Sequence, residues 1–253
     1  MKTALILYYT RPNRFSLNPL AGALEVHDEL KSVAVSFPTD AAQLRRAVRA
    51  ALRSHDRAVV GFSFATPQLA SALPLVEGLR EAFPSRTLFV AGGPHPSADP
   101  GACLRAGFDL VARGEGEETL REVILRVRAG GAVQGVAGTL WLDAQGRVRS
   151  GGRRRALDLD AFPPFAPGRG KFGPIEITRG CPYACGFCQT SMLLGVRPRH
   201  RSPAVVAAYA GLMARRGMLD LRVVTPNAFS YGSPDGRSVE LEAVRELFAA
   251  VRQ

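Results

Sequence analysis

The sequence has 253 residues, of which 46% are hydrophobic and 22% charged, a composition typical of a globular protein of one large or two ordinary domains. No apolar run approaches the roughly 20 residues that a membrane-spanning helix needs, so the sequence excludes a classical membrane-spanning protein. The formal net charge is +11, but arginine is spread along the whole chain, and the clusters 153–155 and 197–201 lack interleaved aromatic residues. We interpret these clusters as solvated surface or contacts to an acidic cofactor, with nucleic acid as the less favoured partner.

The N-terminal stretch "MKTALILYYTRP" lacks the small-residue cleavage site of a signal peptide. We therefore predict that it forms a first strand and that the protein is cytoplasmic, without a membrane partner. Cytoplasmic thiols stay reduced, so clustered cysteines there indicate metal or redox chemistry more often than disulfides. Cys103 stands apart from the other three cysteines, and we predict that it is a small core residue.

Strand-like and helix-like patterns alternate through the first half of the chain. Asp40 with Gln43 forms a capping box, Thr66-Pro67 is a predicted helix start, and Gly130-Gly131 is a helix end. Continuous apolar runs suit a parallel sheet that is buried on both faces. The runs lie at 3–9, 32–37, 57–64, 87–93 and 108–114. This pattern predicts an α/β, Rossmann-like (flavodoxin-like) domain over residues 1–130.

Residues 131–173 are predicted to form a hairpin and a linker. Two alternating runs flank Asp143-Ala144-Gln145-Gly146, and the proline- and glycine-rich stretch "LDLDAFPPFAPGRGKFGP" follows. A second domain then occupies residues 174–253. It begins with a strand at 175–178, and a helix starts at Ser202 and ends at Gly217. A strand at 219–226 and a helix from Ser238 complete two βα units.

The loops after the predicted parallel strands are candidate ligand-binding segments. They read "GFSFATP", "AGGPHPSADP" and "ARGEGEETL", and such loops line the ligand crevice of an open parallel sheet. Glycine there allows a close approach of the backbone, although any domain of this class has glycine turns. Glu115 and Glu117 are explained more simply by the preference of acidic residues for a helix N-terminus.

Three cysteines lie within eight residues in the stretch "CPYACGFC". Cys181, Cys185 and Cys188 have the spacing C-x3-C-x2-C directly after a predicted strand. Thiolates suit zinc and iron–sulfur clusters alike. A structural zinc needs a fourth protein ligand, for which His200 is the nearby candidate in this domain. A three-cysteine [4Fe-4S] cluster instead leaves one iron open for a substrate. We favour the cluster and keep the zinc site as an alternative.

The cysteine stretch resembles the signature of the radical S-adenosylmethionine superfamily. The resemblance implies that Cys181, Cys185 and Cys188 hold a [4Fe-4S] cluster, that its open iron binds S-adenosylmethionine, and that Phe187 lies near the adenine. It also implies a (β/α)6 partial barrel, a 5′-deoxyadenosyl radical and an external electron donor of the flavodoxin or ferredoxin type. The superfamily often carries a Gly-Gly-Glu-like stretch after its second strand, where this chain has "VVTPNAFSYGS". Asn227 could hold the amino group of the cofactor there, or it could be a turn residue.

The cysteine motif combined with the first domain resembles the cobalamin-binding radical S-adenosylmethionine proteins. The segments that carry this resemblance are "GGPHPSADP", "RGEGEETL" and "LDLDAFPP". It implies that Ser63, Thr66, Gly92 and Gly93 lie along the nucleotide tail of cobalamin. The segment "YTRPNRFSLNP" lacks the Asp-x-His-x-x-Gly motif, so a bound cobalamin would have no histidine on its lower face. We predict that His95 is a crevice residue and not a cobalt ligand.

Three functions remain open on these residues. The favoured one is a radical enzyme that uses S-adenosylmethionine and cobalamin, with methyl transfer or another radical modification of an unidentified small molecule or other substrate. The second is a radical enzyme with an empty B12-type domain that modifies RNA, as methylthiotransferases do. The third is a non-catalytic iron–sulfur or zinc module. A six-strand barrel needs about 180 residues at about 30 per βα unit. Residues 174–253 hold only two such units, so we expect a truncated chain or a completing partner.

Overall fold

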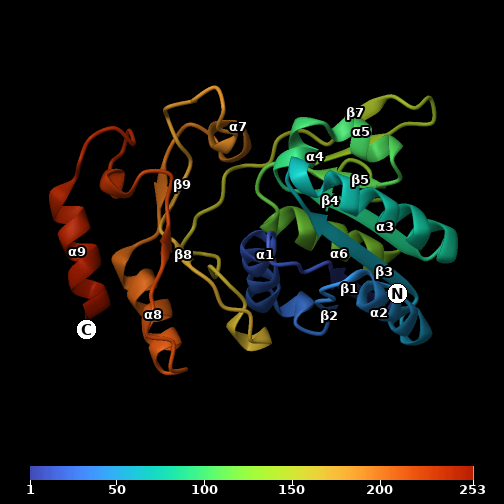
Figure 1. Cartoon of the computed structure of the whole chain (residues 1–253), viewed down its shortest axis with the longest axis horizontal. Coiled ribbons are helices and arrows are strands. Elements are labelled where there is room, and N and C mark those ends of the chain that lie inside the picture. Colours follow the sequence, from blue (N-terminus) through green and yellow to red (C-terminus); the bar gives the residue numbers. More distant parts are fainter. Residues whose placement is uncertain (253) are drawn as a thin grey trace. The chain divides into compact units, whose positions relative to one another are not determined.

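The computed structural model describes residues 1–252, and the chain divides into two compact units, Met1–Arg155 and Ala156–Gln253 (Figure 1). The first unit is therefore longer than the predicted domain of 1–130. The predicted hairpin is the reason for the difference. It forms β6 (Thr139–Leu142) and β7 (Val148–Ser150), and β6 pairs with β5 (Leu110–Ala112) in an antiparallel ladder. Residues 131–152 thus extend the sheet of the first unit and do not belong to a linker.

The first unit contains a seven-stranded sheet in the order β2-β1-β3-β4-β5-β6-β7, which is parallel from β2 to β5. The other strands are β1 (Thr3–Leu7), β2 (Ala34–Ser36), β3 (Arg57–Ser63) and β4 (Thr87–Gly92). β1 is buried along its whole length, and so is β3 after Arg57, as expected for a sheet covered on both faces. The predicted α/β class and the parallel sheet are confirmed.

The helices α1 to α6 lie in the same unit as this sheet (Figure 1). The main core includes side chains of β3, α2 and α3. Helices α1 and α6 contact each other. Asp40 caps α2 through the amide of Gln43 at 2.8 Å, and Gly130 ends α6 with a φ of 73°, as predicted. The helices are α1 (Arg14–Val26), α2 (Ala41–Ser54), α3 (Leu69–Ala82), α4 (Pro94–Ala98), α5 (Pro100–Arg105) and α6 (Glu117–Ala129), with 3-10 turns η1 (Asp28–Leu30) and η2 (Thr66–Gln68).

Two features of the first unit differ from the sequence-based expectation. Thr66 does not cap a helix, because the turn η2 precedes α3 and begins after Ala65, whose amide donates to Gln68 Oε1 at 3.0 Å. Helix α1 was not predicted, since Pro12 precedes it and Pro19 lies inside it. Its buried residues Leu17, Ala21 and Leu24 follow the helical period, and this spacing is the signal that reveals the helix.

The second unit has two small sheets. β8 (Ile175–Glu176) pairs in parallel with β11 (Val223–Val224), and β9 (Thr178–Arg179) pairs antiparallel with β10 (Arg199–His200). The helices are α7 (Thr190–Leu194), α8 (Pro203–Ala214) and α9 (Leu241–Arg252), with 3-10 turns η3 (Pro167–Arg169) and η4 (Ala228–Ser230). Its core is separate and is formed by Phe165, Ile175, Ile177, Val206, Met213, Tyr231 and Leu247. The predicted cap of α8 is confirmed, because Ser202 Oγ accepts the amide of Val205 at 3.4 Å.

Candidate cofactor sites

The strand order of the first unit creates a topological switch point between β1 and β3. The chain runs from β1 outward to β2 on one side and to β3, β4 and β5 on the other. In open α/β sheets the loops after the carboxyl ends of the strands diverge at such a point and leave a crevice for a ligand. The loops after β1, β3 and β4 are therefore the ones that form the candidate site.

Asn13 fastens the loop after β1 to the end of β3. Its Nδ2 donates to the carbonyl of Tyr8 at 2.9 Å and to the carbonyl of Ser63 at 3.0 Å, while its Oδ1 accepts the amide of Thr10 at 2.8 Å. The hydroxyls of Ser16 and Ser63 lie 2.8 Å apart, and Ser63 is only 6% exposed. Ser63 was predicted from the sequence, but Asn13 was not, because its role depends on a contact between two strand ends that are distant in the sequence.

Gly92 and Gly93 lie next to Ser63. Gly92 is the register partner of Ser63 in the β3–β4 ladder. Gly93 has a φ of 91°, and a Cβ atom there would lie 2.9 Å from Ser63 Oγ and 3.0 Å from the amide nitrogen of Phe64. Both the positive φ and the lack of space require glycine at this position. The structure thus brings Ser63, Gly92 and Gly93 together at one corner of the sheet.

Thr66 reaches the same corner through His95. Its Oγ1 lies 3.0 Å from His95 Nδ1, and the imidazole stacks on the ring of Phe64 with centroids 5.8 Å apart. His95 Nε2 is buried and has no hydrogen-bond partner within residues 1–252. A buried polar atom without a partner is costly, so this nitrogen is suited to a further polar group at the corner. His95 is a residue of the strand-end corner, as the sequence analysis proposed.

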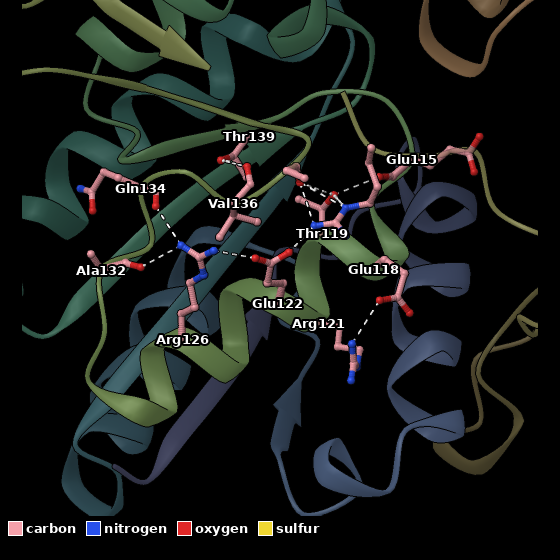
Figure 2. A network of polar contacts seen from close by, with 12 residues as sticks. Glu115, Glu118, Thr119, Arg121, Glu122, Arg126, Ala132, Gln134, Val136 and Thr139 are labelled. Carbon is pink, nitrogen blue, oxygen red and sulfur yellow. Dashed lines mark hydrogen bonds and ion pairs between the residues drawn. The ribbon is translucent and has the colours of Figure 1, made fainter. Parts of the chain in front are cut away.

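Helix α6, which follows β5, carries a polar network that fixes the end of the first unit (Figure 2). The carboxylate of Glu122 accepts from Arg126 at 2.7 Å and from Arg154 at 2.6 Å, and Arg154 also donates to the carbonyl of Ala137 at 2.9 Å. Burial acts to raise the pKa of Glu122, but the hydrogen bonds and charges of the two arginines outweigh it and lower this pKa. Arg154 therefore stabilises the fold, and its assignment to solvated surface or an acidic cofactor was wrong.

The cysteine loop of the second unit starts directly after β9. Gly180 has a φ of 95°, and a Cβ atom there would lie 2.4 Å from the carbonyl oxygen of Arg197. The amide of Cys181 donates to the carbonyl of Gly195 at 3.0 Å, and that of Cys188 to the carbonyl of Cys185 at 2.9 Å. Ala184, with a φ of 48°, is the only residue other than glycine within 1–252 that has a positive φ. Such a conformation costs about 1 kcal/mol and is concentrated at functional loops.

The three thiols suit an iron–sulfur cluster by their chemistry. Cys185 is exposed, Cys181 and Cys188 are half-buried, and all three are free thiols on one loop. Within residues 1–252, no three His, Cys, Asp or Glu side chains lie close enough together to hold a metal ion. The ligand set therefore stays a prediction. Phe187, the predicted neighbour of the adenine, is 93% exposed and available for a ligand.

His200, the candidate fourth ligand of a zinc site, has hydrogen-bond partners on both ring nitrogens. Its Nδ1 lies 3.0 Å from Thr178 Oγ1, and its Nε2 lies 2.8 Å from the carbonyl oxygen of Ser233. The carbonyl can only accept, so Nε2 carries the proton and Nδ1 accepts from the threonine hydroxyl. Both nitrogens are thus engaged in hydrogen bonds within the second unit, and the zinc alternative with His200 as a ligand gains no support. A set of three thiols without this histidine fits a cluster with one open iron.

Two arginines next to His200 hold the start of the second unit. Arg199 donates to the carbonyl of Leu157 at 2.7 Å, and Arg201, which is 1% exposed, donates to the carbonyl oxygens of Leu159 and Phe162. Burial lowers the pKa of Arg201, and nearby carboxylates oppose this effect. The cluster 197–201 was interpreted as solvated surface or a cofactor contact, and for Arg199 and Arg201 this was wrong.

Asn227 lies in the loop after β11. Its Oδ1 accepts the amide of Phe229 at 3.3 Å, and its carbonyl oxygen accepts from the hydroxyls of Thr225 and Ser230. Asn227 thus caps the turn η4, which agrees with the turn-residue interpretation. Its predicted contact with S-adenosylmethionine stays a prediction.

No helix within residues 1–252 combines the length and the apolar character that crossing a membrane requires.

Residues 16–124 match the sequence model of the B12 binding domain, and this range lies within the first unit. The chain is 27% identical over 164 residues to the uncharacterized methyltransferase PH0819 of Pyrococcus horikoshii, an alignment that covers 60% of this chain and 35% of the relative. It is 30% identical over 132 residues to the uncharacterized methyltransferase sll1242 of Synechocystis, which covers 51% of this chain and 22% of the relative. The chain thus matches about a third or less of the length of these relatives.

Two solved structures resemble the chain over its whole length. One is the cobalamin-dependent S-adenosylmethionine radical enzyme OxsB with aqua-cobalamin and S-adenosylmethionine bound, with a TM-score of 0.77 and 17% identity over 37% of that chain. The other is the radical S-adenosylmethionine methyltransferase TsrM from Kitasatospora setae, with a TM-score of 0.69 and 19% identity over 50% of that chain. At these identities the likeness shows the fold. A B12-binding-type domain in the first unit is confirmed, whereas the partial barrel stays a prediction.

Proposed function

We propose that this chain is part of a radical S-adenosylmethionine enzyme that uses cobalamin and a [4Fe-4S] cluster, most simply for methyl transfer. The observation that supports the proposal is that one chain combines a B12-binding-type domain with a separate loop of three free cysteines. The first unit has a switch-point corner inside a B12-binding-type domain. The second has three free thiols on one loop, and the nearby histidine is engaged elsewhere.

In this proposal the cysteine loop holds the cluster, and the corner of the first unit holds cobalamin. Cys181, Cys185 and Cys188 would ligate three irons, and Phe187 would cover the adenine of S-adenosylmethionine. When bound, the cluster supplies the electron that cleaves S-adenosylmethionine, and cobalamin supplies the methyl group. An external flavodoxin- or ferredoxin-type protein would provide that electron.

The residues of the first unit have distinct tasks toward cobalamin. Gly92 and Gly93 let the backbone approach the nucleotide tail closely, since no side chain projects there. Ser63 and Thr66 would line the tail with hydroxyls, and their contacts with Ser16 and His95 fix their orientation. Asn13 keeps the loop after β1 in place through its bonds to Tyr8 and Ser63. His95 Nε2 offers an unused hydrogen-bonding atom beside these groups.

Anaerobic reconstitution and cobalamin binding test the proposal separately. The chain should take up about four irons and show the broad absorbance of a cluster near 400 nm, and Cys185→Ala should abolish it. Cobalamin should remain bound through gel filtration, and Gly92→Trp should remove it while the cluster stays. One bound zinc without colour would contradict the radical chemistry. A cluster without cobalamin would favour the alternative with an empty B12-type domain.

A further inference from the structure

The turn Ser233–Ser238, between η4 and α9, is held by several hydrogen bonds among its own residues. Ser233 is fully buried, and its Oγ lies 2.8 Å from Asp235 Oδ1 and accepts the amide of Gly236 at 2.9 Å. Asp235 Oδ1 also accepts the amides of Arg237 at 2.8 Å and Ser238 at 3.1 Å. These bonds to the carboxylate lower the pKa of Asp235 to about 2. The side chains of Ser233 and Asp235 thus stabilise the conformation of the turn.

The inner side of the turn is tied to the strand that leads into the cysteine loop. The carbonyl of Ser233 accepts from His200 Nε2, and His200 Nδ1 accepts from Thr178, which lies in β9. Only Arg179 and Gly180 separate Thr178 from Cys181. Two hydrogen bonds through His200 therefore connect the turn to Thr178, three residues before the first cysteine.

The outer side of the turn lies directly against the cysteine loop. A Cβ atom at Gly236 would lie 2.9 Å from Pro182 Cδ and 3.2 Å from Pro198 Cγ. The guanidinium of Arg237 donates to the carbonyl of Pro182 at 3.4 Å and lies 5.5 Å from the ring centre of Tyr183. The turn therefore contacts Pro182 and Tyr183, which lie between the first and the second cysteine.

We propose that the turn Ser233–Ser238 positions the cysteine loop. In this proposal Gly236 supports the loop by packing closely against Pro182, and Arg237 places a positive charge beside the loop. The inference rests on the proposed function, since it concerns how the cluster ligands are held. The loop needs such support because it holds a left-handed Ala184, and Phe187 is almost wholly exposed. Groups that orient metal ligands contribute strongly to metal affinity, and a cation nearby stabilises the additional negative charge of a reduced cluster.

Gly236→Ala tests the contact, and Gly217→Ala is its matched control. The two glycines have φ values of 72° and 75°, but the described part of the chain leaves open space around Gly217. Both variants carry the same backbone strain, so only the contact with Pro182 and Pro198 differs. We expect Gly236→Ala to lose its iron to a chelator about tenfold faster than Gly217→Ala, as for other groups that orient metal ligands. Equal rates would overturn the proposal.

Hydrogen exchange of the cluster-free chain separates this inference from the proposed function. Amides of residues 181–188 should exchange faster in Gly236→Ala than in Gly217→Ala or the unaltered chain, whether or not the protein ever binds iron. If the unaltered chain binds no iron but shows this exchange pattern, the proposed function fails and the positioning role stands. If iron binds and exchange is the same in all three proteins, the positioning role fails alone.

Arg237→Gln tests the charge. We expect the midpoint potential of the cluster to become more negative, because the reduced form loses a stabilising cation. Arg237→Lys should restore the potential in part, since the charge returns without the planar guanidinium. Arg245→Gln removes an equally exposed charge on α9 and is the control. A potential that moves equally in Arg237→Gln and Arg245→Gln would contradict a specific role of Arg237.

Discussion

The two candidate sites are built in opposite ways. The corner of the first unit stands on buried strands of up to seven residues, and hydrogen bonds between distant strand ends fix its loops. The cysteine loop follows strands of two residues and exposes most of its side chains. In the first unit the candidate site is built on buried strands, and the glycines Gly92 and Gly93 leave backbone exposed beside Ser63. In the second unit the candidate ligands are three cysteine side chains on a largely exposed loop.

We expect the largest difference between the two regions in the free energy of unfolding when one phenylalanine in each is replaced by alanine. Phe89 lies in β4 and is fully buried, whereas Phe187 in the cysteine loop is 93% exposed. Phe89→Ala should lower the free energy of unfolding by about 4 kcal/mol, because it leaves a cavity in the core. Phe187→Ala should change it by less than about 0.5 kcal/mol and instead weaken binding of S-adenosylmethionine. Urea denaturation and a binding titration measure both effects.

A large loss of stability in Phe187→Ala would break the comparison, since it would mean that the cysteine loop packs against a core. Leu88→Ala is a useful control for the strand itself, because Leu88 is the only half-buried residue between the two ends of β4. Its effect should lie between those of Phe89→Ala and Phe187→Ala.

The sequence predicted different things in the two units. The runs at 57–64 and 87–93 predicted parallel strands because burial on both faces leaves a continuous apolar pattern. The same analysis missed that β6 joins this sheet, since a hairpin signal is local and does not show which edge it pairs with. In the second unit the spacing of the cysteines gave the candidate ligands, which stay a prediction, but it gave no sign of the contact of Gly236 with Pro182. That contact joins segments far apart in the chain.

Gly93→Ala tests how tightly the corner of the first unit is built. Gly93 and Gly146 have φ values of 91° and 73°, but only Gly93 would bring a Cβ atom against the backbone of Phe64. Gly93→Ala should therefore destabilise the chain by about 2 kcal/mol more than Gly146→Ala, through overpacking. Denaturation curves give this difference. Equal effects would show that the loops after β3 and β4 can move apart, and the corner would be no more rigid than the cysteine loop.

The segment that joins the two units is held from both ends. Arg154 is bound to Glu122 in the first unit, and the carbonyl of Leu157 accepts from Arg199 in the second. Only Arg155 and Ala156 lie between these two anchors. Arg154→Gln should speed tryptic cleavage after Arg153 and Arg155 by about tenfold, because a hydrogen bond to a charged group no longer opposes local opening.

Mass spectrometry of the early fragments locates the cut, and Arg149→Gln is the control, since Arg149 pairs with Asp143 in the exposed hairpin. Unchanged cleavage in Arg154→Gln would show that the network of Figure 2 does not restrain this segment.

A smaller difference between the two units is expected in how their stability depends on pH. The pKa of Glu122 is lowered in the folded first unit, and that of Asp235 is lowered to about 2 in the second. A carboxyl group with a lowered folded pKa stabilises the protein above its unfolded pKa, and this contribution disappears as the pH falls through the folded value. Glu122→Gln should therefore destabilise the chain at pH 6, and the difference in the free energy of unfolding from the unaltered chain should shrink below about pH 4.5.

For Asp235→Asn the difference in the free energy of unfolding should shrink only between about pH 3.9 and the folded pKa of Asp235. Urea denaturation at pH 6, 4 and 3 therefore distinguishes the two carboxylates. If both differences vanished over the same range, the four backbone and hydroxyl groups that donate to Asp235 would hold its carboxylate no more firmly than two arginines hold that of Glu122.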